Sequence, residues 1–199
     1  MTFLHRLRLI SRRFQRDTDG SMPTEGVIAF AFLAWWYVAS YQFFDAFRQK
    51  NVNLKAAYTI SDLLSRETGY DPSVTGSVPI DQAYVDGLNK VFDYLTYSNR
   101  PTWIRVTSIK YDDVDKKYKV HWSATSSNVT YPAHNNTSIN NEAWRLPVMP
   151  AGDTVILVET SMAYDPIFTF VLPSSWVSNF IVTRPRFASC VPWGTTGGC

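Results

Sequence analysis

The longest uninterrupted apolar stretch of the chain lies near its N-terminus, where the run from Gly26 to Phe44 carries no formal charge. A helix rises about 1.5 Å per residue, so this run covers about 28 Å, close to the hydrocarbon thickness of a bilayer. Asp45 ends the uncharged run, and Arg48 and Lys50 mark the far interface. Core helices of soluble domains rarely go this long without a charge. The pattern therefore predicts one transmembrane helix over residues 21–48.

Apolar residues at helical spacing continue beyond the predicted membrane segment until Gly69 and Pro72 stop the pattern. The apolar positions of this continuation are Leu54, Ala57, Tyr58, Leu63 and Leu64. After a turn-rich loop over 69–79, a second helix is predicted over about 80–97. The apolar stripe of this second helix comprises Tyr84, Leu88, Val91, Phe92 and Leu95.

The remainder of the chain has segments rich in β-branched and aromatic residues, which are typical of strands. The predicted strands are Thr102–Tyr111, Tyr118–Thr125, Asp153–Tyr164 and Trp176–Thr183. Residues 126–141 are rich in Ser, Asn and Thr and are predicted to form an exposed loop. The expected fold class is α+β. In it a long N-terminal helix, which spans the membrane once and continues outside it, packs with a second helix on a small antiparallel sheet.

Charge decides the expected orientation of the chain. Arginines crowd the segment before the apolar run, at Arg6, Arg8, Arg12, Arg13 and Arg16. By the positive-inside rule, residues 1–20 form a basic cytoplasmic leader at the membrane surface, and residues 49–199 form a domain on the other side. The formal net charge is only +2, and the positive excess lies in the leader, so no nucleic-acid partner is predicted.

Residues capable of chemistry are few. The two cysteines, Cys190 and Cys199, lie close together in the C-terminal tail, in a domain expected on the oxidising side of the membrane. Three alternatives remain open: a disulfide between them, two separate thiols, or a Cys199 that pairs elsewhere. His121 alternates with strand residues and is predicted to lie on the surface, while His134 lies in the polar loop. No catalytic motif or metal-binding spacing is visible, so we predict neither an enzyme nor a cofactor or metal site.

Aromatic residues gather in the second half of the apolar run, at Trp35, Trp36, Tyr37 and Tyr41. Amphipathic rings suit the headgroup boundary. Three consecutive side chains of a helix cannot all face one direction, so some of these rings must face lipid or the helix of another protein. We predict that this group contacts a membrane-protein partner.

Gly20 is followed at the fifth position by Glu25 and then by the apolar helix, an order that resembles the processing signal of type IV prepilins. The stretches DTDGSMPTEGVIAFAF, GDTVILVETSMAYDP and VTRPRF are similar to TadE/TadF-like pseudopilins of the tight-adherence pilus system. The resemblance implies a pilin-like fold in the bacterial inner membrane with a periplasmic domain. It also implies that a prepilin peptidase cuts between Gly20 and Ser21. Glu25 would then neutralise the new α-amine of a neighbouring subunit during assembly.

Two hypotheses about function remain open. In the first, the chain is a pseudopilin or minor pilin of tight-adherence pilus assembly. In the second, it keeps its leader and is an accessory or scaffold subunit of another inner-membrane complex, respiratory or photosynthetic, which it contacts through its aromatic helix face. Both imply contact with the lipid bilayer and with other membrane-protein subunits, whereas only the first needs the peptidase.

Overall fold

The computed structural model describes residues 21–69, 71, 73, 79–97 and 99–195, with side chains described from residue 23 onward. The chain divides into two compact units, residues 1–44 and residues 45–199. The leader 1–20, with its arginines and Gly20, lies outside the described residues, as does Cys199.

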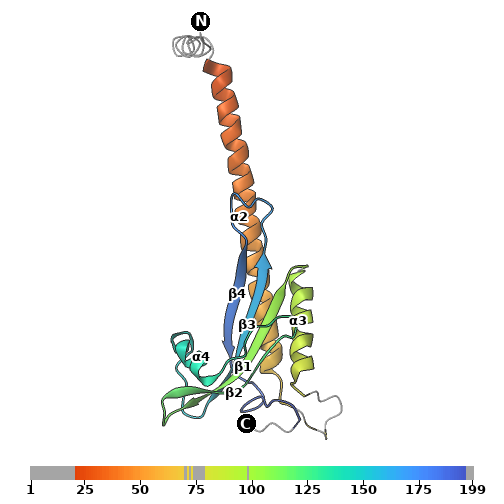
Figure 1. Ribbon diagram of the computed structural model, residues 1–199, viewed down its shortest axis with the longest axis vertical. Coiled ribbons are helices and arrows are strands. Elements are labelled where there is room, and N and C mark those ends of the chain that lie inside the picture. Colours follow the sequence, from red (N-terminus) through yellow and green to blue (C-terminus); the bar gives the residue numbers. More distant parts are fainter. Residues whose placement is uncertain (1–20, 70, 72, 74–78, 98, 196–199) are drawn as a thin grey trace. The chain divides into compact units, whose positions relative to one another are not determined.

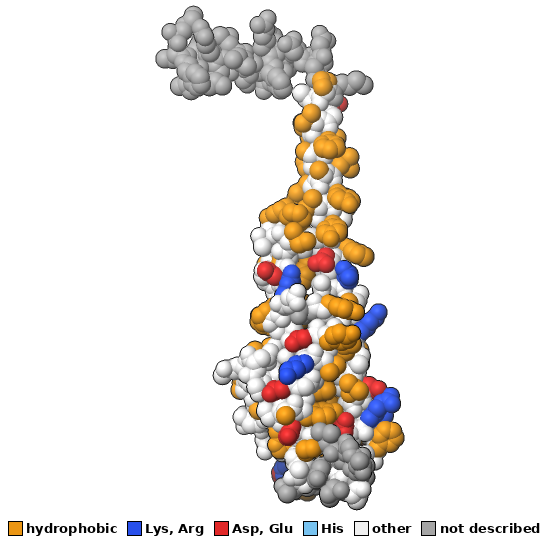
Figure 2. Space-filling model, turned by 90° about the vertical axis from the view of Figure 1, so that its right-hand side faces the viewer, with side chains coloured by type: hydrophobic (Ala, Val, Ile, Leu, Met, Phe, Trp, Pro, Cys, Tyr) orange, Lys and Arg blue, Asp and Glu red, His pale blue; other side chains and the backbone are white. Residues whose placement is uncertain are grey.

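Helix α2 (Ser21–Ser65) is continuous over 45 residues (Figure 1). Pro23 lies in its first turn, where the missing N–H removes no hydrogen bond of the helix. This is the only helix among the described residues that is long and apolar enough to cross a membrane. Only 6% of the most apolar stretch of this helix is buried, so these side chains do not pack into a hydrophobic core. Figure 2 shows these apolar side chains on the surface of the helix.

The part of α2 that belongs to the second unit buries a narrow face of small and branched residues, including Ala56, Ala57, Ile60 and Leu64. The prediction of this face was partly wrong. Ala57 and Leu64 are buried, but the side chains of Leu54, Tyr58 and Leu63 are exposed. Successive residues turn by about 100° around a helix, and the alanines let the sheet approach the face they occupy, which leaves the larger neighbours outside.

Helix α3 (Gln82–Thr96) lies within the predicted range. The Asp81 carboxylate caps its first turn by accepting a hydrogen bond from the Tyr84 N–H at 2.9 Å. The helix ends at Thr96 and is capped by Tyr97, which has a left-handed backbone with φ 50°. The Tyr84 hydroxyl donates to Glu67 Oε1 at 2.8 Å, which joins α3 to the segment that follows α2.

The sheet has four antiparallel strands in the order β2-β1-β3-β4. Their bounds are β1 (Thr102–Asp112), β2 (Lys117–Thr125), β3 (Thr154–Tyr164) and β4 (Ser175–Thr183). Each bound lies within one residue of the prediction, so the α+β class and the antiparallel sheet are confirmed. The central strands β1 and β3 are buried almost throughout, whereas the edge strands alternate. Figure 1 shows the sheet beside α3 and the C-terminal part of α2.

Each face of the sheet carries its own apolar cluster. One face packs Ile104, Val106 and Val158 against α2 and α3. The other face packs Ile109 and Leu157 against residues 139–149. Alternation along the strands sends neighbouring side chains to opposite faces, so β1 and β3 contribute to both clusters.

The predicted exposed loop over 126–141 was wrong in its second half. This part contains helix α4 (Asn136–Asn141), which is followed by the short 3₁₀-helix η1 (Ala143–Arg145). The asparagines that suggest a solvated loop serve the outer edge of β2 instead. Asn136 Oδ1 accepts from the Val120 N–H at 2.7 Å, and Asn140 both accepts from and donates to the Tyr118 backbone. Side-chain amides thus cover an edge that would otherwise present unpaired peptide groups.

Candidate functional site

The surface of α2 carries the residues that the sequence proposes for assembly and partner contact. Glu25 is exposed near the start of the helix. The four aromatic residues Trp35, Trp36, Tyr37 and Tyr41 are all exposed. Tyr37 and Tyr41 lie four positions apart and share a face of the helix, while the two tryptophans point to other sides. Aromatic rings are therefore exposed around much of the helix, and no other described residue of the chain buries them.

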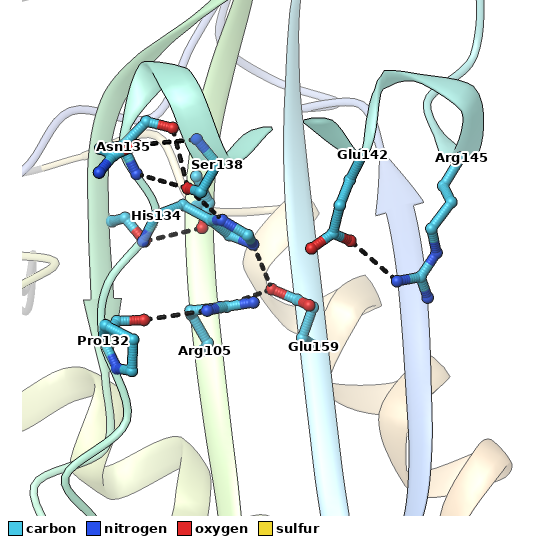
Figure 3. Close-up of polar contacts among 10 residues, drawn as sticks. Arg105, Pro132, His134, Asn135, Ser138, Glu142, Arg145 and Glu159 are labelled. Atoms are coloured by element: carbon cyan, nitrogen blue, oxygen red, sulfur yellow. Dashed lines mark hydrogen bonds and ion pairs between the residues drawn. The ribbon is translucent and has the colours of Figure 1, made fainter. Parts of the chain in front are cut away.

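A buried polar cluster lies on the face of the sheet away from α2. Arg105 of β1 and Glu159 of β3 are directly opposite each other, and Arg105 Nε lies 2.6 Å from Glu159 Oε2. His134 reaches the same carboxylate oxygen, with its Nε2 at 2.9 Å. All three side chains are buried (Figure 3). The cluster thus joins two central strands to the segment that precedes α4.

Further contacts hold this cluster in place. Arg105 Nη1 donates to the Pro132 carbonyl at 2.9 Å, and the guanidinium lies 4.8 Å from the centre of the Tyr131 ring. Tyr131 in turn stacks on Trp103, with ring centres 4.3 Å apart. The guanidinium therefore has an ionic, a peptide and an aromatic partner, which is the set of contacts that suits buried arginine.

The environment sets the charge of Glu159. Burial by itself raises the pKa of this carboxyl, because a charged group loses its hydration. Hydrogen bonds from His134 and Arg105, together with the positive charge of the Arg105 guanidinium, outweigh burial and hold the pKa of Glu159 below its ordinary value. Glu159 is therefore a buried carboxylate at neutral pH, and its partners supply the compensation that a buried charge requires.

Ser138 extends the cluster, since its Oγ lies 2.9 Å from His134 Nδ1. Hydroxyl, imidazole and carboxylate follow one another as in serine hydrolases. The hydroxyl is nevertheless used by the fold: Ser138 Oγ accepts from the Asn135 N–H at 2.9 Å, and the Ser138 N–H donates back to Asn135 Oδ1. These bonds form the capping box of α4. The arrangement therefore fits anchoring of the segment 131–138 better than nucleophilic chemistry.

A second polar cluster lies on the helix face of the sheet. Asn53 of α2 is fully buried. Its amide donates to the Val177 carbonyl at 3.0 Å, and its carbonyl oxygen accepts from the Asn179 amide and from the Thr160 hydroxyl. One asparagine therefore links α2 to both β3 and β4. A buried amide that bonds to two strands in this way specifies the register of the elements it joins.

A groove of about 700 Å³ borders the outer edge of β2. Trp122 and Trp193 line one part of it, with ring centres 5.0 Å apart, and the segment Tyr131–Ala133 lines another. No charged residue lines it. Within the described part of the chain, no group of three or more His, Cys, Asp or Glu side chains is placed to hold a metal ion.

The remaining candidates have different outcomes. His121 is exposed, as predicted. Its ring still loses part of its hydration, and this loss, together with the positive charge of Lys110, lowers the pKa of His121. His134, by contrast, is buried rather than placed in an open polar loop. Cys190 is buried and disulfide-bonded, whereas Cys199 lies outside the described residues.

The sequence alone did not reveal the buried cluster, because its members lie far apart in the chain: Glu159 is 54 positions after Arg105 and 25 positions after His134. One signal was present in the strands. Arg105 lies between Ile104 and Val106 in β1, and Glu159 follows the apolar run from Val155 to Val158 in β3. A charge inside such a segment requires a partner. Comparison with known protein families, with characterised proteins and with solved structures gives no match.

Proposed function

We propose that this chain is a non-enzymatic, single-pass membrane protein that serves as a pseudopilin-like component of tight-adherence pilus assembly in the bacterial inner membrane. The observation that carries this proposal is the exposed apolar helix α2, which continues without a break into an α+β unit. The order Gly20, Ser21, Glu25 at the front of this helix matches what a processing peptidase and a filament need.

Glu25 supports the assembly role through its position. It lies in the first turns of α2, where the partial positive charge of the helix N-terminus favours a carboxylate. A carboxylate at the start of a membrane helix is costly unless it is paired, and acids at such positions are functional candidates. In the proposed assembly, its partner is the α-amine that cleavage creates at Ser21 of a neighbouring subunit.

The absence of a chemical role is also part of the proposal. The buried ionic cluster has its hydrogen-bonding groups occupied by the fold, as the bonds of Ser138 and Arg105 illustrate. We therefore assign Arg105, Glu159 and His134 to the stability of the extracytoplasmic domain, and assign function to the surface of the helix and of the domain.

Mass spectrometry of the protein from its native membrane tests the proposal. We expect a chain that begins at Ser21. Gly20→Ala should leave the leader attached, whereas Gly26→Ala is a matched control, since a Cβ at Gly26 meets no atom within 4 Å. A native chain that begins at Met1 would contradict the proposal.

The second candidate is an uncut accessory subunit of another inner-membrane complex, and the exposed aromatic rings of α2 favour it. Purification in a mild detergent separates the two candidates. Recovery with respiratory or photosynthetic subunits, together with a native N-terminus at Met1, would support the accessory role, while recovery with pilus components would eliminate it.

A further inference from the structure

The connection between β3 and β4, residues 165–174, carries an exposed apolar surface. Ile167 is 67% exposed and Phe170 is 68% exposed, and Trp176 at the start of β4 is exposed as well. Apolar side chains of this size that gather on a loop of a folded domain mark a contact with a protein or with a membrane.

The charge pattern favours lipid. No charged residue occurs between Asp165 and Arg184. Arg100 approaches the same end of the sheet, with its guanidinium 5.8 Å from the centre of the Tyr164 ring. An uncharged aromatic tip with a basic group behind it suits the boundary between acyl chains and anionic headgroups.

The backbone of this connection also suits a surface with little water. The Val171 and Leu172 N–H groups both donate to the Phe168 carbonyl, at 3.1 and 3.4 Å. Pro166 and Pro173 have no N–H to satisfy. Peptide groups that enter a membrane surface must be paired or must remain in contact with headgroup water, so a turn with paired donors costs less to place there.

The position of residues 165–174 within the second unit indicates that the surface they contact is the lipid bilayer. Tyr164 at the end of β3 donates its hydroxyl hydrogen to Asp45 Oδ2 at 3.3 Å. Asp45 is the first charged residue after the uncharged run that begins at Gly26. A helix that spans a bilayer through this run leaves the hydrocarbon near Asp45. The residues that follow Tyr164 therefore start at the depth where the bilayer surface lies.

We propose that residues 166–173 form a second membrane contact, in which Ile167 and Phe170 enter the headgroup–acyl boundary of the leaflet from which α2 emerges. This inference rests on the proposed membrane-spanning role of α2. The contact holds the domain against the bilayer, so that α2 is not its sole support.

The test uses the full-length protein, one copy per nanodisc, with zwitterionic and anionic phospholipids. Phe170→Cys is labelled with an environment-sensitive fluorophore. Reductant is left out so that Cys190 stays in its disulfide bond and does not react with the label. A nitroxide near the headgroup end of a lipid chain should lower the fluorescence at position 170 by about twofold, and aqueous iodide should have little effect. Since Phe170 is exposed, the substitution leaves the core intact.

Two further positions make the outcomes distinguishable. Val114, 91% exposed in the turn at the opposite end of the sheet, is the matched aqueous control, and Val114→Cys should respond to iodide alone. Leu33→Cys tests the span itself. If position 33 is lipid-shielded while position 170 responds to iodide, only the loop contact is overturned. If position 33 also responds to iodide, the proposed membrane function fails. A label at position 170 that neither quencher reaches indicates a protein contact and overturns the lipid contact.

Discussion

Arg105 and Glu159 face each other across the two central strands of the sheet, with Arg105 Nε 2.6 Å from Glu159 Oε2 and both side chains buried. The pair lies on the face that α4 and η1 cover, and His134 bonds to the same carboxylate. A buried pair of this kind gains little over apolar residues of equal size, but loss of one partner leaves an uncompensated charge in the core. The segment before α4 is thus held to the sheet by contacts with the charged side chains of Arg105 and Glu159.

Glu159→Leu should lower the free energy of unfolding by about 3–5 kcal/mol, because Arg105 then remains buried without its carboxylate. The double variant Arg105→Leu with Glu159→Leu should lose less than the sum of the single variants. Urea unfolding in detergent micelles measures both values. Glu142→Leu is the matched control, since Glu142 pairs with Arg145 at 2.9 Å on the surface and should cost under about 1 kcal/mol. Equal losses at Glu142 and Glu159 would contradict the role of burial.

The stability of the domain should depend on pH through Glu159. Its folded-state pKa is held below the ordinary value of 4.5, so the folded state favours the carboxylate. The resulting stabilisation is complete above pH 4.5 and is lost as the pH falls through the folded-state pKa. Urea midpoints measured between about pH 6 and pH 3 should fall more steeply for the natural protein than for Glu159→Gln. Parallel curves for the two proteins would show that Glu159 does not contribute.

Asn53→Ala should destabilise the domain by about 1–3 kcal/mol, because the Val177 carbonyl and the Asn179 amide lose their partner in the core. Asn51→Ala is the control on the same helix. Asn51 is exposed, so its replacement should change the free energy of unfolding by less than about 0.5 kcal/mol. Thermal unfolding followed by circular dichroism compares the two variants, and a similar melting temperature for both would argue against a link between α2 and the sheet at Asn53.

If α2 contacts membrane partners as proposed, Trp36→Ala should weaken that contact without affecting insertion of the helix. Buried tryptophans contribute strongly to interfaces, so the amount of partner recovered with the protein should fall by about tenfold. Trp36→Phe keeps an aromatic ring and should retain most of the partner. The measurement is quantitative mass spectrometry of proteins recovered in mild detergent, with carbonate extraction to verify insertion. Unchanged recovery for Trp36→Ala would remove this ring from the proposed contact surface.

Local sequence patterns predicted the elements of the fold well. The uncharged run before Asp45 predicts a long helix, and the β-branched segments predict the strands within one residue of their bounds. These signals are local, since helix length depends on unbroken apolar periodicity and strand formation on side chains that suit a pleated surface. The same locality explains the failure at 126–141, where the composition suggests a solvated loop. The amides of Asn136 and Asn140 find partners on β2, which the composition of their own segment does not reveal.

The polar clusters required tertiary structure. In the sequence, Asn53 is an ordinary polar residue of a helix. Only the folded structure shows its hydrogen bonds to β3 and β4. The sequence around His134 suggests an ordinary loop residue. Only the folded structure shows that His134 bonds to Glu159, which lies opposite Arg105 in the sheet. In both cases the partner is separated by many residues, and only sheet pairing brings the groups together.

The sequence alone determined that this chain has a long apolar helix that could anchor it in a membrane, basic residues before that helix and an α+β domain after it. These features follow from charge and hydrophobic periodicity, which depend on neighbouring residues. Tertiary structure decided which face of α2 packs, which charges are buried and where the apolar connection after Tyr164 lies. These outcomes depend on strand register and on close packing, in which small side chains such as Ala56 and Ala57 admit the sheet and larger ones such as Tyr58 are turned outward.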